Sequence, residues 1–204
     1  MTASDIGVST RRPRISPLRY PGGKSALYSR LRKMIRDMDL AGCTYVEPYA
    51  GGVGGLDQTG NYKIDARFNR DGLAERIRIL SLYAENIVPT SRDGIDVISE
   101  YAPKDDVFIY ADPPYFEKAG SLYLNAFSAT DHEDLARVLD SVADRPWVLT
   151  YDNAPQVAEL YAARRRREFE LHYSAHRVGK ATEVAVLSES VPEIGQGWPL
   201  TPTT

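Results

Sequence analysis

The sequence has one cysteine, three histidines and no long apolar run, and these scarcities exclude several classes of protein. Cys43 alone cannot form a disulfide or a cysteine-rich metal site within the chain. His132, His172 and His176 lack the spacing of a zinc site. Because there is no apolar span of about 20 residues and no signal-peptide pattern, we expect a cytoplasmic protein without a membrane segment.

A strong charge of one sign is also lacking, since the 204 residues carry a formal net charge of −3. No global field therefore favours nucleic acid. The charge is uneven, however, because the N-terminal stretch is basic and has few acids. Its basic residues are Arg11, Arg12, Arg14, Arg19, Lys24, Arg30, Arg32, Lys33 and Arg36. A local basic surface can bind phosphates even on an acidic protein. For Arg30 to Arg36, however, a solvated helix face is an equally good explanation.

The pattern of apolar residues predicts strands that alternate with helices, which indicates a doubly wound α/β sheet. Helical spacing predicts helices over residues 24–38, 70–84, 92–100, 130–143 and 154–164. Short apolar runs predict strands at Thr44–Val46, Ile87–Val88, Val107–Ala111 and Trp147–Tyr151. A closing antiparallel pair is predicted at Phe169–Tyr173 and Glu183–Leu187.

The most informative junction is the one where the apolar strand Val107–Ala111 runs into Asp112-Pro113-Pro114-Tyr115. In open α/β sheets, ligands bind at the carboxyl ends of the strands. Asp112 supplies a carboxylate there, Pro113 a backbone carbonyl and Tyr115 an aromatic face. These groups suit the binding of a planar ring whose amine must become nucleophilic. The alternative is a proline turn that only ends the strand.

Two glycine turns are further candidate sites. Glu47-Pro48-Tyr49-Ala50-Gly51-Gly52 follows a predicted strand, and its glycines would let the backbone approach a ligand closely. It lacks the GxGxxG spacing, so a simple glycine loop explains it at least as well. Tyr20-Pro21-Gly22-Gly23-Lys24-Ser25 opens a predicted helix, but it has neither Walker spacing nor a preceding strand, which argues against nucleotide hydrolysis.

Several stretches together, in this order, resemble the DNA adenine methyltransferase family, which methylates the exocyclic amine of adenine with S-adenosylmethionine. They are Leu18–Ser25, Glu47–Gly52, Asn61–Arg70, Asp112–Tyr115 and Thr150–Asn153. The resemblance implies a Rossmann-like methyltransferase sheet with helices on both faces. It implies a methyltransferase domain over residues 14–189, with residues 55–80 as a remnant of the DNA-recognition region. We expect a disordered N-terminus over residues 1–13 and a loose tail over residues 190–204.

The resemblance also implies a role for each matching residue. The residues implied to contact S-adenosylmethionine are Tyr20, Lys24, Tyr49, Gly51 and Asp112. Asp112 and the Pro113 carbonyl would accept hydrogen bonds from the adenine amine, and Tyr115 would stack on the base after it is flipped out of the duplex. The residues implied to bind the phosphates of double-stranded DNA are Lys63, Arg67, Asn69 and Arg70. The reaction requires no metal.

The family pattern breaks after Gly52. A dinucleotide-type sheet carries an acidic residue about 20 residues after the glycine turn, where it holds the ribose. No such residue is evident here, and neither Asp57 nor Asp65 follows a recognisable strand. The chain therefore looks internally shortened, without the second strand and most of the recognition segment. The edge beside Thr44–Val46 would then be open, and an open edge invites self-association.

Three functions remain open from the sequence. The first is an adenine-specific DNA methyltransferase, which acts alone or within a restriction–modification system. The second is a catalytically silent, shortened remnant that binds DNA or a partner protein. The third is transfer to another planar amine, such as cytosine, an RNA base or a glutamine amide. The intact Asp112–Tyr115 group supports the first and the gap after Gly52 the second, while the basic residues near Arg67 favour DNA.

Overall fold

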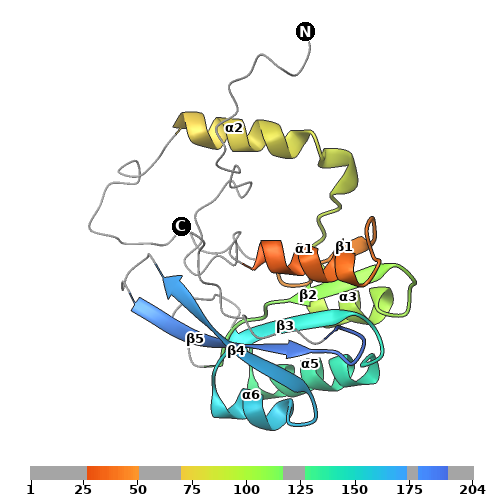
Figure 1. The fold of residues 1–204 in the computed structure, drawn as a ribbon, viewed down its shortest axis with the longest axis vertical. Helices are drawn as coiled ribbons and strands as arrows, with labels where there is room; N and C mark the ends of the chain where they lie inside the picture. Colours follow the sequence, from red (N-terminus) through yellow and green to blue (C-terminus); the bar gives the residue numbers. More distant parts are fainter. Residues whose placement is uncertain (1–26, 51–69, 117–126, 174–178, 193–204) are drawn as a thin grey trace. The chain divides into compact units, whose positions relative to one another are not determined.

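The structure is a computed structural model that describes residues 27–50, 70–116, 127–173 and 179–192 (Figure 1). The chain divides into two compact units. The first, which we call the helical unit, comprises Met1–Arg19 and Gln58–Thr90. The second, which we call the sheet unit, comprises Tyr20–Asp57 and Ser91–Thr204. Each unit is described by itself below.

The sheet unit is built on one mixed five-stranded sheet in the order β1-β2-β3-β5-β4. The strands are β1 (Thr44–Val46), β2 (Val107–Ala111), β3 (Trp147–Asp152), β4 (Arg165–Tyr173) and β5 (Gly179–Leu187). β1, β2 and β3 are parallel, and β5 runs antiparallel to both β3 and β4. The predicted α/β sheet with its closing antiparallel pair is therefore confirmed. Among the described residues β1 is an edge strand, whereas the predicted loss of a second strand concerns residues outside them.

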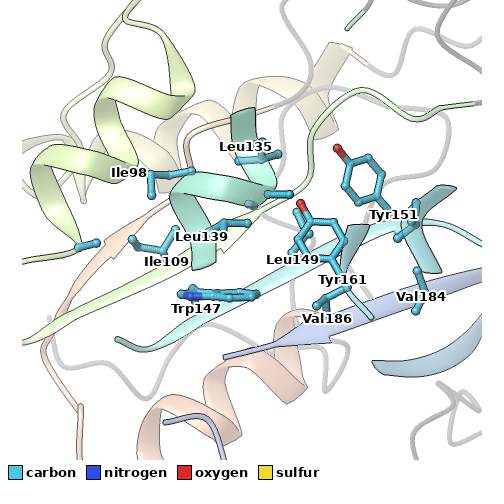
Figure 2. Packing of buried hydrophobic residues seen from close by; sticks show 14 of the residues in the cluster. Ile98, Ile109, Leu135, Leu139, Trp147, Leu149, Tyr151, Tyr161, Val184 and Val186 are labelled. Carbon is cyan, nitrogen blue, oxygen red and sulfur yellow. The ribbon is translucent and has the colours of Figure 1, made fainter. Parts of the chain in front are cut away.

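Helices cover both faces of this sheet, as predicted (Figure 1). On one face, α1 (Tyr28–Asp37) lies over Phe108, Tyr110 and Val148. On the other face lie α3 (Gly94–Tyr101), α5 (Ala129–Ser141) and α6 (Pro155–Leu160). There Ile109, Leu149 and Tyr151 pack with Ile98, Leu135 and Leu139 (Figure 2). Successive side chains of a strand point to opposite faces. Because helices cover both faces, β2 and β3 are buried along their whole length.

The start of α5 differs from the prediction because of a capping box. Ser128 is the N-cap residue, and α5 begins at Ala129, one residue before the predicted start at residue 130. Its hydroxyl oxygen accepts a hydrogen bond from the Asp131 backbone N–H at 3.3 Å, and the Asp131 carboxylate accepts one from the Ser128 backbone N–H at 2.7 Å. These reciprocal bonds satisfy donors that a helix start leaves unpaired, so the helix begins before Thr130.

The helical unit shows two further differences. α2 (Arg70–Ser81) ends earlier than predicted and is followed by the 3-10 turn η2 (Ala84–Asn86). The strand predicted at Ile87–Val88 is wrong, since these residues form no strand and are 51% and 81% exposed. Tyr83, which falls within the predicted helix, lies beyond the end of α2 and is exposed. Two apolar residues without a pairing partner are too short to form a strand.

The helix predicted over residues 154–164 ends earlier, at Leu160 in α6, so the basic run Arg164 to Arg167 consists of one residue before β4 and the first three residues of that strand. The Arg164 guanidinium pairs with Asp140 and with Glu189, at 2.7 Å in each case. This pairing links α5 to the segment that follows β5.

Candidate active site

The carboxyl ends of the three parallel strands bring acidic residues to one edge of the sheet. Glu47 directly follows β1, Asp112 directly follows β2, and Asp152 is the last residue of β3. The carboxyl ends of parallel strands are where α/β sheets bind their ligands. The structure thus places the Asp112–Tyr115 group where a binding site is expected.

The Asp112 carboxylate is tied to the neighbouring strand by a chain of hydroxyl groups. The Thr150 hydroxyl donates a hydrogen bond to Asp112 Oδ1 at 2.9 Å. The Tyr110 hydroxyl lies 2.9 Å from the same Thr150 oxygen. Because the single Thr150 hydroxyl hydrogen is directed at Asp112, Tyr110 is the donor to Thr150. Thr150 and Tyr110 are buried, whereas Asp112 is half-buried and accessible to a ligand.

The rest of the turn is anchored to β3 and β5. The Tyr115 hydroxyl donates to Glu183 Oε1 at 2.8 Å, and Glu183 is fully buried in β5. The Phe116 backbone N–H donates to Asp152 Oδ1 at 3.2 Å. With Thr150 holding Asp112, the turn from Asp112 to Phe116 is held at both ends, so its groups are positioned before a ligand binds.

A buried aromatic cluster lies next to this turn. The His132 ring stacks on Phe116 with centroids 3.6 Å apart, and His132 Nδ1 lies 2.7 Å from the Tyr151 hydroxyl oxygen. Burial lowers the pKa of His132, which favours the neutral ring. His132 is therefore a structural residue of the core. The described part of the chain holds no group of three or more acidic, histidine or cysteine side chains that could bind a metal ion.

Tyr49, implied by the resemblance to contact the cofactor, packs against the start of α3. Its ring lies edge-on to Phe127, with centroids 5.6 Å apart, and it covers Gly94. Its hydroxyl oxygen is buried, with no hydrogen-bond partner among the described residues. Gly94 leaves the space that this ring occupies, because a Cβ atom there would stand 2.5 Å from Tyr49 Cζ.

Replacing Gly94 with alanine is therefore expected to displace Tyr49. Crowding a packed site of this kind costs about 1–3 kcal/mol in the free energy of unfolding, which urea denaturation would measure. The double variant Gly94→Ala/Tyr49→Ala is the control, because the new methyl group then has no ring to meet. An equal cost of Gly94→Ala with and without Tyr49 would contradict the interpretation.

Glu47 has a perturbed carboxyl group. Desolvation of the carboxyl group, and then the negative charge of Asp112, raise its pKa to about 7, although the residue as a whole is exposed. The folded protein therefore holds the Glu47 proton more tightly than the unfolded chain, where the pKa is near 4.5. The contribution of Glu47 to stability is full below the unfolded pKa and is lost as the pH rises towards the folded pKa.

We expect Glu47→Gln to remove this pH dependence. Relative to the variant, the wild-type protein should lose stability between about pH 4.5 and pH 7, the window set by the two pKa values. Urea midpoints of the two proteins across this range would measure the difference, with Glu168→Gln, an exposed residue of β4, as the control. A constant difference between wild type and Glu47→Gln would contradict the raised pKa.

The structure describes only part of the site that the sequence predicts. Asp112, Pro113, Tyr115 and Tyr49 belong to the sheet unit. Arg70 begins α2, but its side chain is not among the described ones. The predicted residues that lie outside the described ones are Tyr20, Lys24, Gly51, Lys63, Arg67 and Asn69.

Sequence reasoning gave no role to Thr150 or Glu183, although both contact the predicted catalytic group. Glu183 carried a signal, since it is a charged residue in an otherwise apolar strand segment, Glu183–Leu187. Thr150 lies in the Thr150–Asn153 stretch that carries the resemblance, but its contact with Asp112 was not evident because it depends on the pairing register of β2 with β3.

The comparison with known families agrees with this geometry. A family model for D12 class N6 adenine-specific DNA methyltransferases matches residues 55–179, which is more than half of the chain. The chain belongs to this D12 class family. The matched range contains the Asp112–Tyr115 turn and Thr150, and it begins after the glycine turn Glu47–Gly52. The resemblance noted from the sequence is thus confirmed.

Within this D12 class protein, the sheet is a Rossmann-like methyltransferase sheet. No curated protein matches the chain. Among the described residues, no helix is both long and apolar enough to cross a bilayer. The assignment to the family therefore rests on the family match.

Proposed function

We propose that the protein transfers a methyl group from S-adenosylmethionine to the exocyclic amine of adenine in double-stranded DNA. The observation that carries this proposal is the Asp112–Tyr115 turn, held at the carboxyl end of β2 in a chain of the D12 class family. A cytoplasmic location and a role in restriction–modification remain proposals of the same kind.

The residues at the strand ends fit the cofactor by their chemistry. S-adenosylmethionine carries an ammonium group, a sulfonium centre and ribose hydroxyls, and carboxylates pair well with each of them. Glu47 and Asp112 present carboxyl groups that are accessible at adjacent strand ends. We propose that these two residues hold the cofactor, together with Tyr20, Lys24, Tyr49 and Gly51. When bound, the cofactor supplies an electrophilic methyl group.

The role of Asp112 and Pro113 is to make the adenine amine nucleophilic. The lone pair of this nitrogen is delocalised into the ring, which makes the free base a poor nucleophile. Hydrogen bonds from the amine to the Asp112 carboxylate and the Pro113 carbonyl favour a pyramidal nitrogen with a localised lone pair. Placement and electrostatic stabilisation then provide most of the catalysis.

The target base must leave the duplex to reach this turn, so we propose that the protein flips it. Tyr115 would stack on the flipped adenine, a contact worth about 1–3 kcal/mol per base. The hydrogen bond to Glu183 keeps the Tyr115 ring in one orientation before the base arrives. Lys63, Arg67, Asn69 and Arg70 are proposed to bind the phosphates of the duplex.

The test is to incubate the protein with mixed-sequence duplex DNA and radiolabelled S-adenosylmethionine, followed by nucleoside analysis. We expect the label in N6-methyldeoxyadenosine, and none in a duplex of only dG and dC. Label in cytosine or only in RNA would overturn the adenine assignment in favour of another planar amine. If a protein that melts cooperatively transfers no label to any nucleic acid, the proposal that it is an enzyme would be overturned.

One observation favours a second function, a catalytically silent remnant that binds DNA or a partner. Among the described residues β1 is an edge strand, and its Tyr45 is 43% exposed. Edge strands pair readily with other chains. In that case we expect DNA or partner binding without methyl transfer, and a dimer detectable by analytical ultracentrifugation.

A further inference from the structure

We propose that Thr150, supported by Tyr110, is a positioning residue that fixes the Asp112 carboxylate for methyl transfer. The inference rests on the proposed function and deepens it. Thr150 is fully buried, so it would act through Asp112 rather than by contact with the DNA.

The register of the sheet brings these three residues together. Tyr110 pairs with Val148 and Ala111 with Leu149, which places Asp112 level with Thr150 on the next strand. Tyr110 and Asp112 lie two residues apart, so their side chains leave the same face of β2, the face covered by α1. Thr150 shares that face because it lies two residues after Val148.

The hydrogen bonds within this group have a defined direction. Thr150 uses its one hydrogen towards Asp112 Oδ1 at 2.9 Å, and it accepts from Tyr110 at 2.9 Å. Each bond polarises the next, so the donation to the carboxylate is stronger than that of an isolated hydroxyl. The chain therefore runs from the Tyr110 hydroxyl through Thr150 to the carboxylate.

Asp112 needs such a restraint because a carboxylate rotates easily about its last bond. That torsion is broad and roughly two-fold in aspartate, whereas β-branched Thr150 is stiff at χ1. A bond from a stiff, buried hydroxyl to Oδ1 sets the plane of the whole carboxylate. The plane decides where an amine can donate to Asp112, and small errors of placement are costly in catalysis.

The alternative is a merely structural role, in which Thr150 only satisfies the buried Tyr110 hydroxyl. A second buried hydroxyl in the same strand provides a matched control for the loss of such a group. Tyr151 lies next to Thr150 in β3, is buried on the opposite face, and its hydroxyl forms a 2.7 Å hydrogen bond with His132. Tyr151→Phe removes a buried hydroxyl from the same strand without touching the bond to Asp112.

The experiment measures kcat and the KM values for duplex DNA and for S-adenosylmethionine. The variants are Thr150→Val, Thr150→Ser, Tyr110→Phe and the double variant Thr150→Val/Tyr110→Phe. Valine keeps the shape of threonine but cannot donate, so we expect kcat to fall about tenfold or more with both KM values nearly unchanged. Serine keeps the hydroxyl and should restore kcat to within about threefold of wild type. Tyr110→Phe should lower kcat by only about threefold, since Thr150 still donates.

The double variant should be no slower than Thr150→Val, because Tyr110 acts only through Thr150. Four results would overturn the inference: unchanged kcat in folded Thr150→Val, no rescue by serine, additive losses in the double variant, or an equal loss in Tyr151→Phe. A wild-type protein without methyl transfer would overturn the proposed function as well. An active wild type with an unaffected Thr150→Val would overturn the positioning role alone.

Discussion

Replacing Asp112 with asparagine is expected to slow methyl transfer by about 100- to 1,000-fold while the protein stays folded. Asparagine keeps the size of aspartate but has only one acceptor oxygen. Thr150 donates to Oδ1 in the wild-type protein, so the asparagine oxygen is expected to turn towards Thr150. The amide NH2 would then face the adenine amine, and two donors would meet where the reaction requires an acceptor.

Single-turnover rates at saturating DNA and S-adenosylmethionine would measure this effect. Asp152→Asn is the matched control, because Asp152 also lies at a strand end and accepts a hydrogen bond from the Phe116 backbone, yet it has no proposed contact with adenine. The control should retain activity within about tenfold, the cost of one supporting hydrogen bond. A rate for Asp112→Asn equal to that of Asp152→Asn would contradict the catalytic role of Asp112.

The core strands were predictable because their sequences leave little choice. Val107–Ala111 is a continuous apolar run, and Trp147–Tyr151 is apolar except for Thr150. Both runs are bounded by polar or turn residues, which is typical of strands buried on both faces. The structure reproduces the first and extends the second by Asp152. The prediction of a strand at Ile87–Val88 was wrong because a short apolar pair carries no information on whether a neighbouring strand exists. The predicted start of α5 was wrong because its N-cap residue, Ser128, lies outside the apolar periodicity.

The candidate site was predictable only where it is local in the sequence. Asp112, Pro113 and Tyr115 occur in one turn, so the chemistry that they support can be inferred without the fold. Their supports come from far along the chain, since Thr150 lies 38 residues from Asp112 and Glu183 lies 68 residues from Tyr115. These contacts depend on strand order and register, and β5 lies between β3 and β4 against the order of the sequence. No local pattern specifies such an insertion.

The two parts of the Tyr115 side chain are expected to serve different purposes. The ring is proposed to stack on the flipped adenine, whereas the hydroxyl donates a hydrogen bond to buried Glu183. Tyr115→Phe should therefore leave kcat/KM within about threefold but lower the free energy of unfolding by about 1–3 kcal/mol, because it removes a donor from a buried carboxyl group. Tyr115→Ala should lose the ring as well.

For Tyr115→Ala we expect kcat/KM for duplex DNA to fall about 100-fold, which corresponds to the upper half of the range for loss of one base–aromatic stack. Both variants must be assayed at a temperature where they are folded, since Tyr115 is only 6% exposed and its removal also leaves a cavity. Tyr101→Ala, a half-buried tyrosine of α3, controls for the loss of a packed ring away from the turn. If Tyr115→Ala and Tyr101→Ala lose the same activity, Tyr115 is a packing residue. If Tyr115→Phe is as slow as Tyr115→Ala, the hydroxyl bond to Glu183 rather than the stacking face governs the reaction.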